Sequence, residues 1–394
     1  MWPFTHSLDE LAEVDLRALV TAAAREGTGL EFKREMYQRR DPERTREMLR
    51  DVASMANADG GVLIIGMEED GQGTAQQLIP VPDAEAEANR LVQLCLAHIA
   101  ERIPGLRALR TPIQGGDVIV VRIPRSYRRP HMITFEGMTD FWIRHDRQKS
   151  RMSVAEVRTA VTGTEDVEMK VQRYAESRMT SGQSRGAAFI VAASPMLIED
   201  GRISIEDERL PALLRRPPTF RPRVGVSLSD EDCKIHPTLR GLAAVVAGIQ
   251  ELEVFRNGHV EFLLFRHDMI SKRQAGTSGN ILHGWAVAEY IRNFAHLIVA
   301  LRGIGGIVDP YLIAVAIFNC RGVSMAEAGV DMWGRGRIGQ WTEDDHIVLD
   351  PILMPADEPA DSGAQRVANR LWNAFHFQRC PFFLDDGRFH IPGR

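Results

Sequence analysis

The sequence lacks most of the features that mark secreted, disulfide-stabilised or membrane-spanning proteins. Four of its 394 residues are cysteines, and none of them has the spacing of a disulfide framework or a zinc site. No apolar run reaches the ~18 residues that a membrane-spanning helix needs. The first residues carry neither the basic nor the apolar segment of a signal peptide. We therefore expect a cytoplasmic protein with reduced cysteines and no membrane partner.

Several catalytic signatures are also missing. The sequence holds no G-x4-G-K-[ST] phosphate loop and no recognisable Ser-His-Asp or Cys-His arrangement. The letters G-x-G-x-x-G occur at residues 334–339, but they lack the preceding strand and the following helix of a dinucleotide site. We interpret them as a basic turn. Cys233 and His236 have a metal-like spacing, but no second pair completes a zinc site.

Length and composition predict a globular protein of two or three domains. Strands and helices alternate in the first part of the chain, and a small, polar segment at residues 179–186 interrupts this pattern. Asn257-Gly258 stands between two apolar runs, which predicts a hairpin in the second half. The predicted fold is α+β, with an α/β domain at residues 1–162, a helical segment and linker at 163–186, and a second α+β domain at 187–394.

Apolar periodicity places the main elements. In the first domain we expect helices at residues 43–57 and 83–103 and strands at residues 30–34, 62–66, 117–123 and 140–144. In the second half we expect strands at residues 188–193 and 312–318, a helix at 287–301 and a late helix around 367–375.

Acidic residues flank two of the strands expected in the first domain. They are Glu26, Glu31, Glu68, Glu69 and Asp70. Carboxylates gathered at one end of a sheet are the usual ligands of Mg²⁺ or Mn²⁺. The alternative is structural: Glu31 pairs with Lys33, which shares its strand face, and the other acids end a helix or form a solvated turn.

A basic block lies inside this acidic chain. Residues 105–158 contain 11 lysines and arginines against 5 acids, although the whole chain has a net charge of −5. Arginine suits phosphate groups and aromatic rings suit exposed bases, although we expect Trp142 to pack in the core. The alternative is a solvated charged face. The predicted nucleic-acid-binding residues are Arg122, Arg125, Arg128, Arg129, Arg144, Arg147, Lys149 and Arg151.

The motifs of the first domain, taken in order, resemble the Schlafen-type AlbA domain. The series consists of E-x4-E-F-K at residues 26–33, A-N-x-x-G-G at 56–61, an acidic run at 68–70, I-V-V-R-I-P at 119–124 and the aromatic strand at 141–144. The resemblance covers roughly residues 8–160. The second half carries no familiar motif.

This resemblance implies a metal-dependent endoribonuclease that cleaves structured RNA such as tRNA, with a role in antiphage defence. Its metal ligands would be Glu26, Glu31 and Glu69, with Glu68 as the other choice for the third position. Lys33 would contact the transition state. The characterised nucleases carry Asp at the third position. Glutamate is one methylene longer and would shift a ligand by ~1.5 Å, enough to slow a reaction.

The resemblance also supports a second hypothesis. Many bacterial relatives are described as nucleic-acid-binding regulators, which implies a non-catalytic DNA- or RNA-binding transcriptional regulator with a C-terminal sensor domain. Under either hypothesis the partner is nucleic acid, with RNA favoured over DNA. Vertebrate Schlafen nuclease cores contain two related lobes, whereas this chain has one copy. We therefore expect a homodimer.

Overall fold

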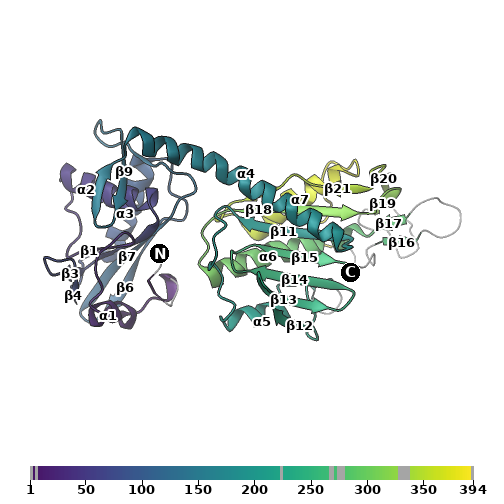
Figure 1. Ribbon diagram of the computed structural model, residues 1–394, viewed down its shortest axis with the longest axis horizontal. Helices are drawn as coiled ribbons and strands as arrows, with labels where there is room; N and C mark the ends of the chain where they lie inside the picture. The colour runs from purple at the N-terminus through teal and green to yellow at the C-terminus, as the bar shows by residue number, and fades with distance from the viewer. Residues whose placement is uncertain are drawn as a thin grey trace. The chain divides into compact units, whose positions relative to one another are not determined.

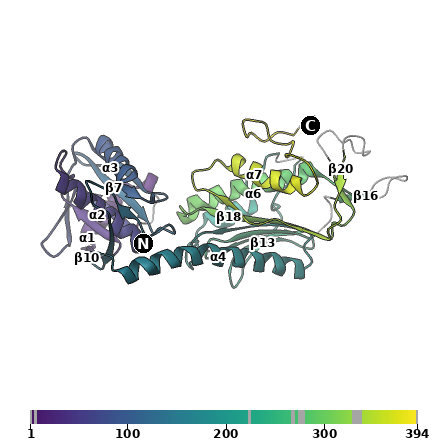
Figure 2. The ribbon, with the colours of Figure 1, turned by 90° about the horizontal axis from the view of Figure 1, so that it is seen from above.

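The computed structural model describes residues 3–4, 8–221, 225–265, 270–272, 280–326 and 338–391. The chain forms two compact units, Met1–Val167 and Glu168–Arg394 (Figures 1 and 2). The long helix α4 (Val154–Ser184) has residues in both. Each unit combines helices with mostly antiparallel sheets, so the predicted α+β class is confirmed.

The helices of the first unit are η1 (Leu8–Glu10), α1 (Glu13–Thr21), α2 (Pro42–Asn57), α3 (Ala84–His98) and the start of α4. Its strands are β1 (Leu30–Lys33), β2 (Gly60–Ile65), β3 (Met67–Glu69), β4 (Ala75–Leu78), β5 (Ile99–Ala100), β6 (Arg107–Ile113), β7 (Gly116–Pro124), β8 (Met132–Ile133), β9 (Asp140–His145) and β10 (Gln148–Arg151).

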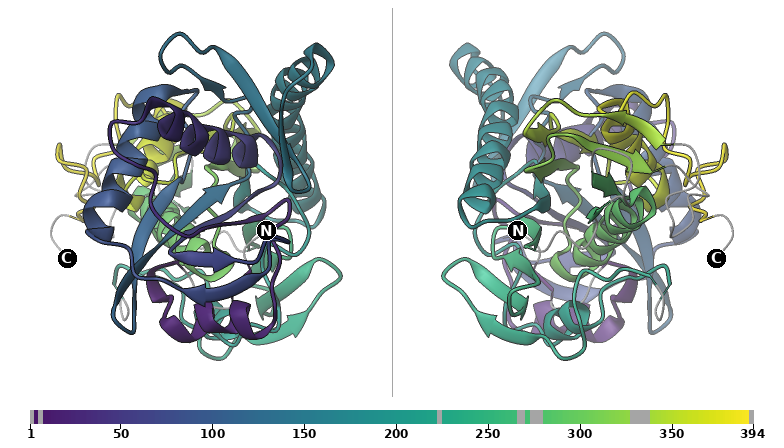
Figure 3. Two further views of the ribbon diagram at one scale, coloured as in Figure 1. Left: turned by 90° about the vertical axis from the view of Figure 1, so that its left-hand side faces the viewer. Right: turned by 90° about the vertical axis from the view of Figure 1, so that its right-hand side faces the viewer.

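The central sheet of the first unit has the strand order β1-β2-β7-β6, with β1 parallel to β2 and at the edge. In the left view of Figure 3, the purple and blue helices of this unit lie above and below its strands. Glu31 registers with Leu63 and Phe32 with Ile64. Since side chains alternate along a strand, Glu31 and Lys33 share the face that α2 and α3 cover, while Phe32 packs into the core on the α1 side. The predicted division of these faces is confirmed.

Helix α2 forms where its sequence predicts, and it joins the two sheets of the first unit. The Asp41 carboxylate caps its first turn by accepting two backbone N–H groups. At its other end, Asn57 donates to the carbonyls of His131 (3.0 Å) and Trp142 (2.8 Å). These bonds fasten α2 to the second sheet, β10-β9-β8-β5. Trp142 packs against the core, as expected.

The helices of the second unit, besides the end of α4, are α5 (Arg209–Arg215), α6 (Gly284–Gly305) and α7 (Ala360–Asn373). Its strands are β11 (Phe189–Pro195), β12 (Lys234–Pro237), β13 (Gly241–Val246), β14 (Gln250–Phe255), β15 (Val260–Leu264), β16 (Ile270–Lys272), β17 (Asn280–Leu282), β18 (Tyr311–Phe318), β19 (Val323–Ala326), β20 (Ile338–Trp341), β21 (His346–Val348) and β22 (Ile352–Met354).

The second unit is built on a large sheet with the order β12-β13-β14-β15-β11-β18-β21, to which β22 adds beside β18. Helices α5, α6 and α7 pack on one face, and the second half of α4 packs on the other. The hairpin predicted at Asn257-Gly258 joins β14 to β15 and is confirmed. A smaller sheet has the order β16-β17-β19-β20.

The structure corrects the predicted linker. Residues 179–184 continue α4 instead of forming a flexible segment. The reason is tertiary packing, because Ala175 and Met179 are buried against the sheet of the second unit. A Cβ at Gly182 would overlap the side chain of Ile190, so this glycine permits close approach of the helix and does not mark a linker.

Two smaller expectations also need correction. The helix expected at residues 83–103 ends at His98, because Ile99 and Ala100 pair with β8 instead. Strand β6 was not predicted. The four cysteines are free and buried, as expected. Most of the turn expected at residues 334–339 lies outside the described residues. Across the described ranges, no helix is long and apolar enough to cross a membrane.

Candidate functional site

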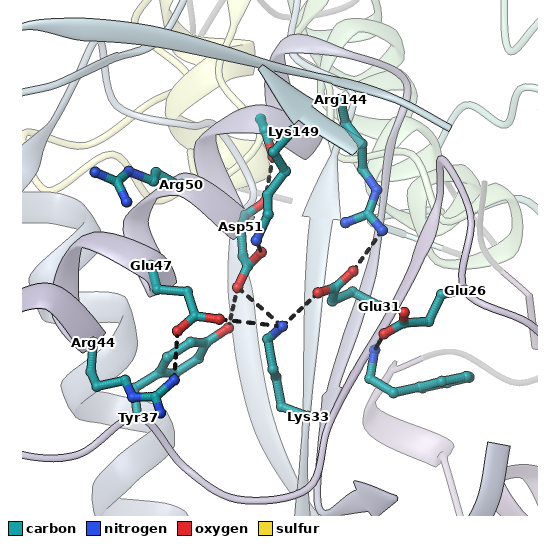
Figure 4. Close-up of polar contacts among 12 residues, drawn as sticks. Glu26, Glu31, Lys33, Tyr37, Arg44, Glu47, Arg50, Asp51, Arg144 and Lys149 are labelled. Carbon is teal, nitrogen blue, oxygen red and sulfur yellow. Dashed lines mark hydrogen bonds and ion pairs between the residues drawn. The ribbon is translucent and has the colours of Figure 1, made fainter. Parts of the chain in front are cut away.

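Glu31 lies on the edge strand β1 and is only 6% exposed. The Lys33 ammonium donates to its Oε1 (2.6 Å) and the Arg144 guanidinium to its Oε2 (2.6 Å), as Figure 4 shows. Burial alone would raise the pKa of Glu31, but the charges of Lys33 and Arg144 outweigh burial and hold the pKa below its usual value. Glu31 is therefore an ionised, buried carboxylate whose two oxygens each face a cation.

Lys33 is shared among three carboxylates. Besides Glu31, its Nζ lies 3.7 Å from Glu47 Oε1 and 3.7 Å from Asp51 Oδ2 on α2. Burial works to lower the pKa of Lys33, but these carboxylates, with Asp51 first, raise it above the usual value. The pairing of Glu31 with Lys33 that we kept as the structural alternative is present, within a wider network.

Asp51 is the functional candidate that no motif predicted. It is fully buried and accepts hydrogen bonds from the Tyr37 hydroxyl (2.6 Å) and the Lys149 ammonium. Burial, and then the Asp51 charge, raise the pKa of Tyr37 well above its usual value, so the hydroxyl remains a donor. Asp51 stands three residues after Met48 and four before Met55, on the apolar side of α2. A single acidic residue on the apolar side of a helix is the sequence feature that could have identified Asp51.

Glu26 approaches the same region from the segment before β1. Its Oε1 accepts the backbone N–H of Phe32 (2.9 Å), and its Oε2 lies 3.5 Å from Arg147 Nη2. The pKa of Glu26 is raised, first by burial and then by the nearby carboxylates of Glu31 and Glu69. Glu26 also adjoins the turn of Glu69, because its backbone N–H donates to the carbonyl of Gly73 (2.9 Å), the residue whose N–H Glu69 accepts.

The acidic run at residues 68–70 shapes the turn between β3 and β4. Glu69 is exposed and accepts the backbone N–H of Gly73 (2.7 Å). Asp70 accepts two further backbone N–H groups in the same turn. Glu68 pairs with Arg34 (2.7 Å). These contacts are those of the solvated turn that we kept as an alternative.

The predicted Mg²⁺ or Mn²⁺ ligands do not fit a metal ion as their side chains stand. Among the residues that the structure describes, no group of three or more His, Cys, Asp or Glu side chains is placed to hold one. Glu31 faces two cations, and Glu69 turns to the backbone of Gly73. Glu31 is thus compensated by two cations of the protein, and Glu69 is held by the turn.

Three basic residues of the β9–β10 hairpin face three of these acids. Arg144 binds Glu31, Arg147 approaches Glu26, and Lys149 binds Asp51. The side chains of Arg147 and Lys149 are 43% and 23% exposed, whereas that of Arg144 is fully buried. One guanidinium nitrogen of Arg144, Nη1, is buried and has no hydrogen-bond partner within the described part of the chain. Arg151 follows at the end of the hairpin, is 67% exposed and pairs with Asp140 (3.1 Å).

The remaining predicted basic residues form a separate group at the end of β7 and in the loop after it. They are Arg122, Arg125, Arg128 and Arg129. Arg122 registers with Val62 and so lies on the α1 side of the sheet. Arg125 and Arg129 approach the turn after α2, and Arg128 is 47% exposed. The predicted set is thus divided between the hairpin and the β7 end.

A small cavity adjoins the carboxylate network. Its volume is ≈ 80 Å³, and its lining includes Lys33, Tyr37, Arg44 and Glu47. Arg44 donates to Glu47 one turn further along α2 (2.9 Å). The cavity gives the Lys33 side of the network a path to solvent.

The second unit holds a Ser-His-Glu cluster that sequence patterns did not predict. Ser194 Oγ lies 2.8 Å from His259 Nδ1, and His259 Nε2 lies 3.3 Å from Glu261 Oε2. Arg178 of α4 donates twice to Glu261 (2.8 and 2.6 Å). Ser194, His259 and Glu261 are at most 1% exposed. The cluster therefore presents no nucleophile to solvent, and it fastens α4 to the sheet.

Comparisons with known proteins concern the first unit. Residues 26–153 match the Schlafen, AlbA_2 family, and no family matches the second half. Two solved structures are similar to 36% of the chain: the DIP2311 protein of Corynebacterium diphtheriae (19% identity, 26% of that chain, TM-score 0.26) and the N-terminal domain of a RecG-related protein of Nitrosomonas europaea (18% identity, 93% of that chain, TM-score 0.26). The match thus spans about a quarter of the length of the first. No curated protein matches the chain.

Proposed function

Since the first unit is a Schlafen AlbA_2 domain, we propose that it binds nucleic acid, with RNA favoured over DNA. The main support for this proposal is the β9–β10 hairpin. The side chains of Arg147, Lys149 and Arg151 are partly exposed there, so phosphate groups can reach them. Exposed ion pairs contribute only ~0–1 kcal/mol. A phosphate group can therefore replace Asp140 as the partner of Arg151 at little cost, whereas Glu26, whose side chain is 13% exposed, would lose a counter-ion at a partly buried position.

The test is equilibrium binding of the full chain to tRNA, single-stranded RNA and duplex DNA, followed by fluorescence anisotropy at several salt concentrations. We expect tighter binding to RNA and affinity that falls with salt. Arg147→Gln combined with Arg151→Gln lowers affinity by about tenfold or more at low salt. Arg321→Gln is the matched control, because Arg321 is as exposed as Arg151 (68%) and pairs with Asp345 (2.8 Å) in the second unit. Equal losses in both variants, or no salt-dependent binding, would reject the proposal.

We further propose a candidate activity, the metal-dependent cleavage of structured RNA such as tRNA, with antiphage defence as its setting. The observation in its favour is the position of Glu26, whose Oε1 accepts the backbone N–H of Phe32, next to Glu31, and whose own N–H donates to Gly73 in the turn that Glu69 caps. This activity requires Lys33 or Arg144 to leave Glu31 before a metal ion can bind there, because the two cations occupy both carboxylate oxygens.

Cleavage is tested by incubating the full chain with total RNA in the presence of Mn²⁺ or EDTA. Glu26→Ala and Glu31→Ala are the active-site variants, and Glu26→Ala is the one less prone to destabilise the fold because Glu26 is less buried. We expect cleavage with Mn²⁺ that EDTA and either variant abolish. Cleavage that persists in EDTA and in both variants would rule out this site. RNA binding without cleavage would support the non-catalytic regulator.

We also propose that the chain forms a homodimer. Vertebrate Schlafen nuclease cores contain two related lobes, which build the groove together, whereas this chain contains one AlbA_2 match. Light scattering after size exclusion should give twice the chain mass of 44.1 kDa at micromolar concentration. A monomer mass at every concentration would contradict the proposal.

A further inference from the structure

An open cavity of the first unit lies outside the carboxylate network, where α3 ends and β5 begins. Its volume is ≈ 410 Å³, and its lining includes Leu96, Ala97, Ala100, Arg102, Arg128 and Thr134. We propose that this cavity binds one unpaired nucleotide of an RNA strand, with the base against its apolar wall and the phosphate on its two arginines. This inference rests on the proposed binding of nucleic acid and adds to it a subsite for a base.

The apolar wall of the cavity faces solvent. Leu96 is 39% exposed, and Ala97 and Ala100 are also exposed. Covering this surface with a base removes apolar area from water on both sides, which is favourable. The Thr134 hydroxyl has no hydrogen-bond partner in the described part of the chain, so it can bond to the edge of the base. Small-molecule sites hold about 300–1,000 Å³, so this cavity has room for one nucleotide and not for several.

Two arginines supply positive charge at the same cavity. Arg102 is exposed and has neither a hydrogen-bond nor an ion-pair partner among the described residues. Arg128 is 47% exposed, and its guanidinium lies over the Tyr127 ring (5.6 Å), which orients it. Its carboxylate partner, Glu101, is 65% exposed and 3.8 Å away. A phosphate can replace such an exposed partner at little cost, and guanidinium groups fit phosphate oxygens well.

The charge of this cavity distinguishes it from the larger one at the other end of α3. The larger cavity (≈ 810 Å³) is lined by three acids, Asp83, Glu85 and Asp117, and by Arg110. Arg110 is already paired with Asp117 (3.1 Å) and Glu85 (3.4 Å). Three carboxylates against one paired arginine repel a phosphate, whereas the smaller cavity has two arginines and one acid. Size alone would therefore select the wrong cavity for a nucleotide.

The cavity and the basic hairpin lie at opposite edges of one sheet. In the strand order β10-β9-β8-β5, the hairpin includes β10 and the cavity adjoins β5. Neighbouring strands are ~4.8 Å apart, so the two edge strands are separated by ~14 Å. A single strand of a few nucleotides can reach both, with phosphates on the hairpin and one base in the cavity. Arg128, which the hairpin leaves out, then has a place in the same interface.

The experiment compares two labelled single strands of RNA of about eight nucleotides, a length typical of single-strand sites. One strand is complete, and the other has an abasic ribose at every position. Both carry the same phosphate charge, so a difference in affinity reports contacts with bases. Anisotropy titrations with the full chain are made in EDTA, which prevents metal-dependent cleavage. We expect the complete strand to bind about tenfold more tightly, the usual effect of one base contact.

Variants assign the base contact to the cavity. Ala97→Trp fills the cavity and should bring the affinity ratio of the two strands close to one without weakening the abasic strand. Leu96→Glu places a charge on the apolar wall and should also remove the preference, which keeps the test valid if Ala97→Trp does not fold. Ala86→Trp is the matched control and should keep the ratio, because Ala86 is an exposed residue of the same helix that lines the larger cavity. Arg102→Gln should weaken both strands by a similar factor and lower the salt slope by about one.

The outcomes separate this inference from the proposed function. If the unaltered chain binds both strands equally and in a salt-dependent way, the inference is overturned and the proposed function stands. A preference for bases that survives both Ala97→Trp and Leu96→Glu also overturns it, because the bases then lie elsewhere. Adenosine monophosphate that displaces the complete strand at a concentration near the Kd of that strand would assign the cavity to a free nucleotide and reject the RNA assignment. If neither strand binds, the proposed function itself falls.

Discussion

The two units bury charge in contrasting ways. In the second unit, Glu261 meets Arg178 and His259 inside a closed cluster, and each partner comes from an element packed in the same core. In the first unit, Glu31 and Asp51 meet bases from a hairpin that also carries exposed arginines. A closed cluster has no group left for a ligand. In the first unit, by contrast, the counter-ions belong to a hairpin whose other bases reach solvent.

This contrast shows that residue type alone does not separate structural from functional clusters. Ser194, His259 and Glu261 are the residue types of a catalytic triad, but they are sealed beneath α4. The position of the counter-ions, in the core or on a surface element, is the feature that distinguishes the two clusters.

The largest effect is expected in the closed cluster. Arg178→Met leaves the Glu261 carboxylate buried without its two guanidinium bonds and should lower the free energy of unfolding by about 3–5 kcal/mol. Urea denaturation followed by fluorescence measures the loss. Adding Glu261→Gln should recover part of it, since the uncompensated charge is then gone. A loss below about 1 kcal/mol for Arg178→Met would show that the cluster is not closed.

Buried histidines provide a second contrast. His259 faces Glu261, whereas the Nδ1 of His131 donates to the Glu101 carbonyl and its Nε2 has no hydrogen-bond partner among the described residues. Burial lowers the pKa of His131 to about 4. The unfolded chain binds a proton near pH 6.5 and the folded chain does not, so stability falls as the pH drops from 6.5 towards 4.

His131→Gln should remove this acid sensitivity, because glutamine keeps an N–H donor for Glu101 and does not titrate in this range. Each pKa unit corresponds to ~1.4 kcal/mol, so the unaltered chain should lose about 3 kcal/mol between pH 6.5 and 4 that the variant retains. Urea denaturation at a series of pH values measures the difference. Parallel pH profiles for the two proteins would contradict the assignment.

Lys33→Met should have a smaller effect, about 2 kcal/mol, because Arg144 still compensates Glu31 and Lys149 still compensates Asp51. The folded-state pKa of Glu31 lies below its unfolded value. Its contribution is therefore present above pH ~4.3 and lost as the pH falls through the folded pKa. The deficit of Lys33→Met should accordingly be largest near neutral pH and shrink in acid. A deficit as large as that of Arg178→Met would break the comparison between the units.

Sequence patterns were sufficient for the elements that local rules determine. Helix α2, the strands around Glu31 and Leu63, and the hairpin at Asn257-Gly258 follow from periodicity, capping and turn chemistry. The prediction of a linker at residues 179–186 was wrong because of a tertiary effect. The burial of Met179 against the sheet outweighs the helix-breaking tendency of Gly182.

Sequence patterns predicted only part of the candidate site, because some of its contacts are local and others depend on tertiary packing. The pair Glu31 and Lys33 follows from strand alternation, which is local. Asp51 and Tyr37 join the network through the packing of α2 on the sheet, and Arg144 reaches Glu31 across 113 residues of sequence. Spacing rules contain no information on such long-range pairs, so the counter-ions of the site could be known only from the fold.

The smallest effect concerns the exposed end of the hairpin. Arg151 is 67% exposed, so Arg151→Gln should change stability by less than about 0.5 kcal/mol. If Arg151 contacts a phosphate, the variant should reduce the slope of log affinity against log salt concentration by about one, with a similar loss on every RNA sequence. Arg321→Gln, which removes an equally exposed arginine of the second unit, should leave the slope unchanged. A loss of affinity confined to one RNA sequence would assign Arg151 to base recognition. An unchanged slope would show that Arg151 contacts no phosphate and would restrict phosphate binding to the hairpin residues that face the carboxylates.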